Sequence, residues 1–211
     1  MSVTREQLKE ALVKGKQKDL LNLLPAALKE GLDPVVIMNE IFIPGMIEVG
    51  DLFSSGKYFL PQMMIAARSM SEAMKILEPE LTKTSYTKKA VAIIGTVQDD
   101  FHDIGKNIVR MILNGAGYDM IDLGVDVHGD QFIAAIKEHK PKFILLSALI
   151  TLTMDSMARI VAEITESGLR DQVVIGVGGA PITEAFAKEI GADFYAEDAH
   201  EAVMKCDAYM R

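Results

Sequence analysis

Five short apolar runs alternate with helical segments after residue 88 of this 211-residue chain, and no other feature constrains the fold as strongly. The runs are AVAIIGTV, YDMIDLG, KFILLSAL, QVVIGVGG and ADFYA. Each is followed by a segment whose apolar residues recur at helical spacing. Parallel strands need crossover connections, which are usually helices, and strands covered on both faces read as continuous apolar runs. We therefore expect a doubly wound α/β domain with a five-stranded parallel sheet.

The preceding residues, 1–82, read as helical throughout and predict a different kind of domain. The signals that begin, end or bend the helices are a Thr4 and Gln7 capping box, a C-cap at Gly31, Pro34, an interior Pro44 with Gly45, and Pro61. Four helices of this length predict a small four-helix bundle. The polar segment LTKTSYTKK reads as a linker, so we place a helical domain at 1–87 and an α/β domain at 88–211.

Composition narrows the possible functions. Residues 88–211 carry 12 Lys and Arg against 19 Asp and Glu, and so hold most of the formal charge of −8. Because nucleic-acid binding depends on clustered Lys and Arg, DNA and RNA are not expected partners. Cys206 is the only cysteine, which excludes an internal disulfide and predicts a reducing, cytoplasmic location. Neither a signal-peptide pattern nor an 18-residue apolar stretch occurs, so no membrane association is expected.

Three groups of residues stand after the first, third and fourth predicted strands. They are Asp100-Phe101-His102-Asp103-Ile104-Gly105, Ser147-Ala148-Leu149 and Gly178-Gly179. In open α/β sheets, ligands bind outside the carboxyl ends of the strands, at the point where the strand order reverses. We therefore expect the three groups to line one crevice.

His102 has the most distinctive chemistry in these groups. A lone loop histidine is more often a hydrogen-bonded structural residue than a metal ligand. Asp100, however, is the kind of acceptor that fixes one imidazole tautomer and leaves the other ring nitrogen free for a metal. The remaining histidines, at 128, 139 and 200, do not have the spacing of a zinc site. A single protein ligand suffices only if another molecule holds the metal.

In type and spacing, the three groups resemble the cobalamin-binding signature of corrinoid-dependent methyltransferases and mutases. That signature reads D-x-H-x-x-G, S-x-L and G-G; here 41 residues separate Gly105 from Ser147, and 28 separate Leu149 from Gly178. The resemblance implies a flavodoxin-like or Rossmann-like sheet domain and, as cofactor, cobalamin or a related corrinoid whose ring supplies four nitrogens to cobalt. It also implies that His102 is the lower axial ligand, in place of the cofactor's own benzimidazole.

By the same resemblance, the three groups and the residues after them contact the cofactor. The implied set is Asp100, His102, Asp103, Ile104, Gly105, Ser147, Leu149, Thr151, Thr153, Gly178 and Gly179, without a separate catalytic residue. Its glycines leave room for the bulky nucleotide tail, its serine offers a hydroxyl and its leucine an apolar wall. Thr153 stands where the family has the hydroxyl that completes a relay with His102 and Asp100. Asp99 departs from the pattern, since many relatives have glycine there, but it is not expected to abolish binding.

The helical half resembles the cap module of methionine synthase and of the small corrinoid proteins of methylotrophic methyltransferase systems. PGMIEVGDLFSSGKYFLPQMMIAARSMSEAM carries this resemblance, which for the methylotrophic proteins spans almost the whole chain. The expected underside of the cap over the corrin is Met46, Val49, Gly50 and Phe53, with packing inside the bundle as the alternative. The methionines expected to be adaptable core are Met63, Met64, Met70 and Met74.

The implied function is to carry a methyl group on cobalt, as a subunit of a methyltransferase system rather than as a self-sufficient enzyme. The cofactor would alternate between cob(I)amide and methylcob(III)amide. The implied partners are a substrate-specific corrinoid methyltransferase, a methylcorrinoid:acceptor methyltransferase acting on a thiol or a tetrahydrofolate, and a reductive activase. The linker is the expected hinge for cap movement. Methylamines, methanol, betaines and methoxyaromatics all remain possible methyl donors.

Two alternatives share the cofactor, and a third shares only the fold. A cobalamin-binding regulatory or sensor protein would need a DNA-reading module, and its light-sensing form a tryptophan, which this chain does not contain. A mutase-type cobalamin subunit would lack the helical cap and would act with a barrel. A flavodoxin-like or receiver domain without cobalamin would explain the fold but not the three motifs.

Overall fold

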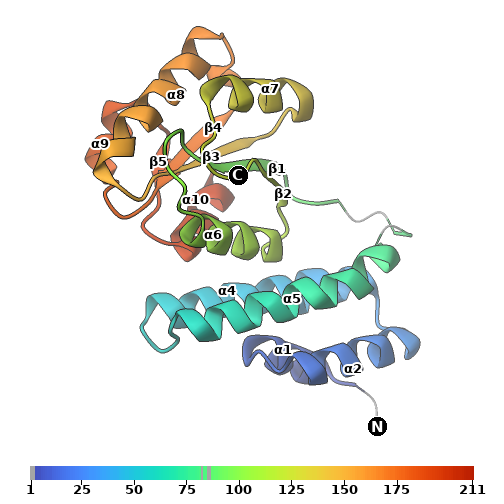
Figure 1. Cartoon of the computed structure of the whole chain (residues 1–211). Coiled ribbons are helices and arrows are strands. Elements are labelled where there is room, and N and C mark those ends of the chain that lie inside the picture. Colours follow the sequence, from blue (N-terminus) through green and yellow to red (C-terminus); the bar gives the residue numbers. More distant parts are fainter. Residues whose placement is uncertain (1–2, 82, 85–86) are drawn as a thin grey trace. The chain divides into compact units, whose positions relative to one another are not determined.

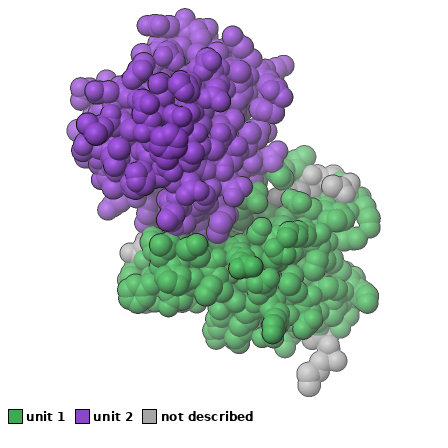
Figure 2. Space-filling view, viewed as in Figure 1, with its two compact units in different colours: residues 1–88, 114–117 green, residues 89–113, 118–211 purple. Residues whose placement is uncertain are grey.

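The computed structural model describes residues 3–81, 83–84 and 87–211. The chain divides into two compact units, residues 1–88 with 114–117 and residues 89–113 with 118–211 (Figure 2). The first unit is helical and the second contains a five-stranded parallel sheet, which confirms the predicted fold class. Three residues of the predicted hinge, at 82, 85 and 86, lie outside the described residues.

The helical unit begins with α1 (Arg5–Val13) and α2 (Gln17–Lys29), whose end signals act as predicted. The Thr4 hydroxyl accepts the backbone N–H of Gln7 at 3.2 Å, and the Gln7 side chain accepts the N–H of Thr4 at 2.9 Å. These two bonds form the expected capping box. After α2, Gly31 has a φ of +90°, a conformation that glycine adopts without steric cost.

The third helical stretch continues without a break through Pro44 and Gly45. It consists of α3 (Pro34–Val36), the π-helical η1 (Ile37–Phe42) and α4 (Ile43–Ser54). The sequence predicts a bend or interruption at Pro44, and the structure has its irregularity in the turn just before it. Pro44 lacks an N–H and its ring would clash with the fourth carbonyl before it, so the preceding turn widens from α to π geometry.

The fourth helix, α5 (Leu60–Leu81), begins next to Pro61 as expected. It packs against α2 and α4 within the helical unit. Its buried side chains recur at three- and four-residue spacing and include Met63, Ala66, Met70, Ala73, Met74 and Leu77. The prediction of methionine core is confirmed at three positions but is wrong for Met64, which is 44% exposed.

The five strands of the second unit coincide with the five predicted runs. They are β1 (Val91–Thr96), β2 (Asp119–Asp122), β3 (Phe143–Ser147), β4 (Val174–Gly178) and β5 (Phe194–Tyr195). All pairs are parallel, in the order β2-β1-β3-β4-β5. The chain leaves β1 towards β2 on one side and returns to β3 on the other. The switch point therefore lies between β1 and β3, where Thr96 is registered with Ser147.

Helices cover both faces of the sheet, as the alternation predicts (Figure 1). They are α6 (Ile104–Gly115), α7 (Gly129–His139), α8 (Met154–Glu166), α9 (Glu184–Glu189) and α10 (Ala199–Ala208). Figure 1 shows α6 and α10 on one face and α7, α8 and α9 on the other. One buried cluster joins the latter face to the sheet and includes Phe132, Ile144, Ile160 and Ala187. Every helix among the described residues is too short or too polar to cross a bilayer.

Candidate functional site

The loop between β1 and α6 places Asp100 and His102 at the switch point of the sheet. The Val97 N–H donates to the Ser147 carbonyl at 3.0 Å, and the Asp100 N–H donates to the Val97 carbonyl at 3.1 Å, so the chain turns directly after β1. Asp100 is only 1% exposed, whereas 52% of the His102 side chain is exposed. The loop therefore buries the carboxylate and presents the imidazole.

Asp100 is a buried carboxylate whose two oxygens are approached by four hydrogen-bond donors of other residues. Its Oδ1 accepts the backbone N–H of His102 at 3.0 Å and lies 2.7 Å from His102 Nδ1. Its Oδ2 accepts the Leu149 N–H and the Thr153 hydroxyl, both at 2.8 Å. Burial raises the pKa of Asp100, but these hydrogen bonds outweigh it and lower the pKa to about 2. The carboxylate is thus ionised at neutral pH and holds a proton on His102 Nδ1.

The other ring nitrogen of His102 is Nε2. Among the described residues it makes no hydrogen bond. The backbone beneath the ring is fixed, because the hydroxyl of the fully buried Thr96 donates to the His102 carbonyl at 2.8 Å. An imidazole with Nδ1 held by a carboxylate and Nε2 without a partner has the arrangement common to histidines that ligate metals.

The surroundings of His102 also fit a flat, largely apolar macrocycle. Large apolar side chains from the loops after β1 and β3 are exposed, namely Phe101, Ile104, Leu149, Ile150 and Leu152. Their exposed fractions range from 38% for Ile150 to 85% for Leu152. Exposed apolar surface of this kind marks a binding site, and a corrin ring would cover it while its metal met Nε2.

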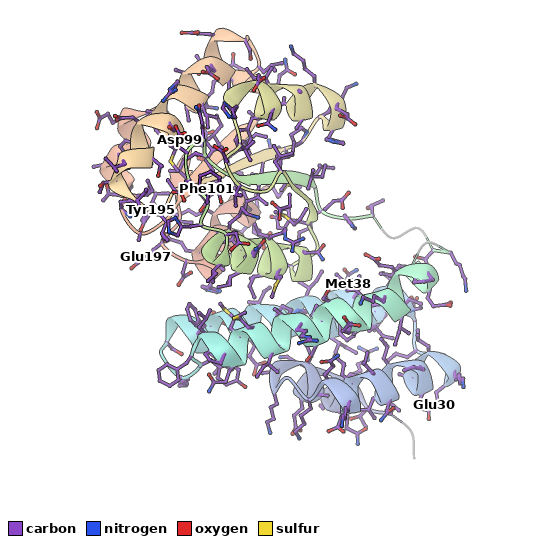
Figure 3. The ribbon with its side chains drawn as sticks, viewed as in Figure 1. Glu30, Met38, Asp99, Phe101, Tyr195 and Glu197 are labelled. Carbon is purple, nitrogen blue, oxygen red and sulfur yellow. The ribbon has the colours of Figure 1, made fainter. Side chains whose placement is uncertain are left out.

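The three predicted groups share one edge of the sheet, as expected. Thr96 is registered with Ser147, and Ser147 is registered with Gly178, so the loops after β1, β3 and β4 start side by side. Figure 3 shows Asp99 and Phe101, from the first loop, on the same edge of the unit as Tyr195 and Glu197, from the end of β5. The loops that carry the three groups therefore begin at neighbouring strand ends, and a shared crevice stays a prediction.

The serine and threonine hydroxyls differ in their surroundings. Thr153 is 2% exposed and ends the 3₁₀ turn Thr151–Thr153 before α8. Its hydroxyl lies 2.8 Å from Asp100 Oδ2 and 2.9 Å from the Ile150 carbonyl, and its single proton favours the charged acceptor. The hydroxyls of Ser147 and Thr151 make no hydrogen bond within the described part of the chain, so both are available to a ligand.

The predicted glycines have reasons within the protein as well. Gly179 has a φ of +127°, and an added Cβ would overlap the Ala148 carbonyl oxygen. A Cβ on Gly178 would lie 2.9 Å from the Ala196 carbonyl oxygen. These two positions thus require glycine for the approach of neighbouring strand ends. A Cβ on Gly105 would meet nothing within 4 Å, so its open space is compatible with an approaching ligand.

Asp99 adopts a backbone conformation that glycine, the residue implied there by the resemblance, would also adopt easily. Its φ is +66°, in the left-handed region that aspartate tolerates better than most residues. The Asp99 N–H donates to Asp126 Oδ1 at 2.8 Å, and the Asp126 N–H donates to the Asp100 carbonyl at 3.0 Å. Sequence reasoning missed Asp126, because no motif marks a brace that comes from another loop.

Ile104, also in the predicted set, is the first residue of α6, and Asp103 directly precedes it. Asn107 donates twice to Asp103, from its backbone N–H to the carbonyl at 2.8 Å and from its side-chain amide to the carboxylate at 3.0 Å. An acidic residue at a helix amino end also interacts favourably with the helix dipole. Asp103 therefore has a structural role at the start of α6, whereas the exposed side chain of Ile104 is free to contact a ligand.

The predicted cap residues differ in exposure. Met46, Val49 and Gly50 are buried, and only Phe53 keeps partial exposure. The exposed large apolar side chains of the helical unit are Phe59, Leu60, Met64 and Ile65, at the start of α5. Sequence reasoning missed this second set; its signal is the largely apolar segment YFLPQMMI. Helical spacing predicts which residues share a face, but not which face stays exposed.

Fold and site together define a cobalamin-binding class of protein, with a helical module before a doubly wound sheet. Residues 90–204 match the family model of a B12 binding domain, and residues 4–78 match a second B12 binding domain model. The trimethylamine corrinoid protein of Methanosarcina barkeri is 44% identical over 184 residues, which cover 86% of this chain and 85% of that protein. Dimethylamine corrinoid protein 2 of Methanosarcina acetivorans is 43% identical over 201 residues, covering 95% and 93%.

A solved structure supports the same assignment over both units. A chain of the methanol:cobalamin methyltransferase complex of Methanosarcina barkeri superimposes with a TM-score of 0.86 at 29% identity, covering 97% of this chain and 78% of that one. The chain belongs to the family of corrinoid proteins that carry these two B12 binding domains.

Proposed function

We propose that this chain carries a methyl group between two methyltransferases, on a corrinoid whose cobalt is bound from below by His102. The observation that carries the proposal is the contact of His102 Nδ1 with Asp100 at 2.7 Å, which leaves Nε2 free at the switch point. When bound, the corrinoid supplies the cobalt that accepts and releases the methyl group. The protein binds the cofactor, orients it and controls the proton on His102.

Asp100 determines which ring nitrogen of His102 would hold the cobalt. While His102 is a ligand, Nε2 must be deprotonated and Asp100 holds the proton on Nδ1. An imidazolium at this position would stay paired with Asp100 through Nδ1. The carboxylate itself does not take this proton, because four hydrogen bonds stabilise its ionised form.

The remaining residues of the site hold the rest of the cofactor. The exposed apolar side chains of Phe101, Ile104 and Leu149 cover the corrin ring, and the Ser147 and Thr151 hydroxyls bind its polar substituents. The open space at Gly105 and the glycine pair after β4 accommodate the nucleotide tail. We assign these contacts from exposure and residue chemistry.

The helical unit serves as a cap that keeps water from the cobalt while the methyl group is carried. Phe53, Phe59, Leu60 and Met64 are proposed as its apolar lining, because each keeps exposed surface. Because several enzymes need the same face of the corrin in turn, the cap has to move, and the linker at 81–89 is the proposed hinge.

Methylated amines are the proposed methyl donors. The relatives reported above are named for trimethylamine and dimethylamine, and the superimposed chain comes from a complex with a methyltransferase. The proposed partners are therefore a substrate-specific amine methyltransferase, a second methyltransferase that passes the methyl group to a thiol or tetrahydrofolate acceptor, and a reductive activase.

The visible spectrum of the protein reconstituted with methylcobalamin tests the site directly. The wild type is expected to show a spectrum with histidine bound to cobalt, and His102→Ala a spectrum without that ligand, with weaker retention on gel filtration. His139→Ala, at the distant end of α7, is the matched control and should resemble the wild type. A His102→Ala variant with the wild-type spectrum and retention contradicts the proposal.

A further inference from the structure

Lys106 is a buried cation at a place unfavourable to cations. It lies in the first turn of α6, and its side chain is 2% exposed. The amino end of a helix carries partial positive charge, which repels a lysine there. A buried ammonium also loses its hydration and needs a close partner. Lys106 is thus unfavourable both for the helix dipole and for its burial. A residue kept at such a place is expected to have a role beyond the stability of the helix.

Asp122, the last residue of β2, is the partner of Lys106. The ammonium lies 2.6 and 2.7 Å from the two carboxylate oxygens of Asp122 and 3.0 Å from Asn107 Oδ1. Asp122 Oδ1 also accepts the Gly124 N–H at 2.9 Å, and Arg110 Nε lies 3.4 Å from Oδ2. The ion pair therefore ties the start of α6 to the end of a neighbouring strand.

Two routes connect this ion pair to the backbone of His102. The first is the chain itself, because His102 lies only four residues before Lys106 and two before the start of α6. The second runs through hydrogen bonds: Gly124, bound to Asp122, accepts the Thr96 N–H at 3.0 Å, and the Thr96 hydroxyl donates to the His102 carbonyl at 2.8 Å. The His102 backbone is thus held from both sides by elements that meet at Asp122.

The position of the His102 ring relative to the cobalt matters, because a metal ligand is effective only when it is held within about 0.5 Å of the right place. We propose that the Lys106–Asp122 ion pair is a positioning element that fixes the start of α6 against β2, and so holds His102 where Nε2 reaches the cobalt. Lys106 acts through His102 and does not touch the metal. This inference rests on the proposed function of His102 as the lower ligand.

The test is the pH at which His102 leaves the cobalt. Acid protonates Nε2 and detaches it, which changes the visible spectrum of protein reconstituted with methylcobalamin. The midpoint pH rises when ligation weakens, by about one unit for a tenfold weaker bond. Residues that support metal ligands typically contribute about 10- to 100-fold to metal affinity. We expect Lys106→Met and Asp122→Asn each to raise the midpoint by about one unit.

The two variants separate positioning from a simple charge effect. Lys106→Met removes a positive charge, which by itself favours protonation of His102 and raises the midpoint. Asp122→Asn removes a negative charge, which by itself lowers the midpoint or leaves it unchanged. Positioning predicts a rise in both variants, whereas opposite shifts, or no shift in Asp122→Asn, overturn the proposal. Lys106→Arg keeps the ion pair and should restore most of the wild-type midpoint.

A matched control accounts for general loss of stability. Arg170 and Asp193 form an ion pair at 2.9 Å in the same unit, away from the His102 loop, so Arg170→Met should keep the wild-type midpoint. If Lys106→Met does not fold, Lys106→Gln retains a donor to Asp122 and is measured instead. A wild type without histidine ligation would refute the proposed function. A ligated wild type whose variants have unchanged midpoints would refute only the positioning role.

Discussion

The hydroxyl of Thr153 lies 2.8 Å from the Oδ2 atom of Asp100, a contact between residues 53 positions apart. It joins the loop after β3 to the loop after β1 across the switch point of the sheet. Together with the Leu149 N–H it satisfies the carboxylate oxygen that faces away from His102. Asp100 is therefore bound on both oxygens, and its orientation towards the imidazole is fixed from the second loop.

Removing the Thr153 hydroxyl should cost both stability and histidine ligation. Thr153→Val keeps the shape but removes a hydrogen bond to a buried charge, and such bonds contribute about 1.5–3 kcal/mol. We expect a loss of that order in the free energy of unfolding of the cofactor-free protein, measured with urea. Thr153→Ser retains the donor and is the control. Equal losses in both variants would show that packing, rather than the hydrogen bond, accounts for the role of Thr153.

Asp100 should make the stability of the protein depend on pH in the acid range. Its pKa is lowered from 3.8 to about 2 in the folded protein, so the ionised form stabilises the fold above pH 4. This contribution, about 2 kcal/mol, is lost as the pH falls from about 4 to 2. Asp100→Asn removes it.

The measurement is urea unfolding at pH 7 and pH 2. Other carboxylates also titrate in this range, so the relevant quantity is the difference between the wild type and Asp100→Asn. We expect the stability lost between the two pH values to be smaller in the variant by about 2 kcal/mol. An identical loss in both proteins would mean that Asp100 has an ordinary pKa in the fold.

Much of the fold, and part of the site, follows from the sequence for physical reasons. The central strands β1, β3 and β4 are almost wholly buried, so their apolar runs are unambiguous, whereas the edge strand β2 is partly exposed. The pair of Asp100 and His102 is also readable, because the two residues are neighbours in one loop. The contacts of Asp99 with Asp126 and of Lys106 with Asp122 span 27 and 16 residues, and they depend on strand register, which no local pattern encodes.

Gly179 should tolerate no side chain, even without the cofactor. Its φ of +127° and the overlap of a Cβ with the Ala148 carbonyl both oppose alanine. Gly168 is the control, because it also has positive φ, at +73°, but has open space around it. We expect Gly168→Ala to cost about 1–2 kcal/mol and Gly179→Ala distinctly more, by thermal unfolding of the cofactor-free protein. Similar costs would mean that the Ala148 loop moves aside easily.

Gly105 is the opposite case, because a side chain there should weaken only the binding of the cofactor and not the stability of the fold. A Cβ there meets no atom within 4 Å, and its φ is not in the left-handed region. Alanine in a helix is more favourable than glycine, so Gly105→Ala should stabilise the cofactor-free protein by about 0.5–1 kcal/mol. If the nucleotide tail passes this position, the same variant should bind cobalamin more weakly, by titration followed in the visible spectrum. Cobalamin affinity equal to that of the wild type would place the tail elsewhere, because the only change is one methyl group in otherwise open space.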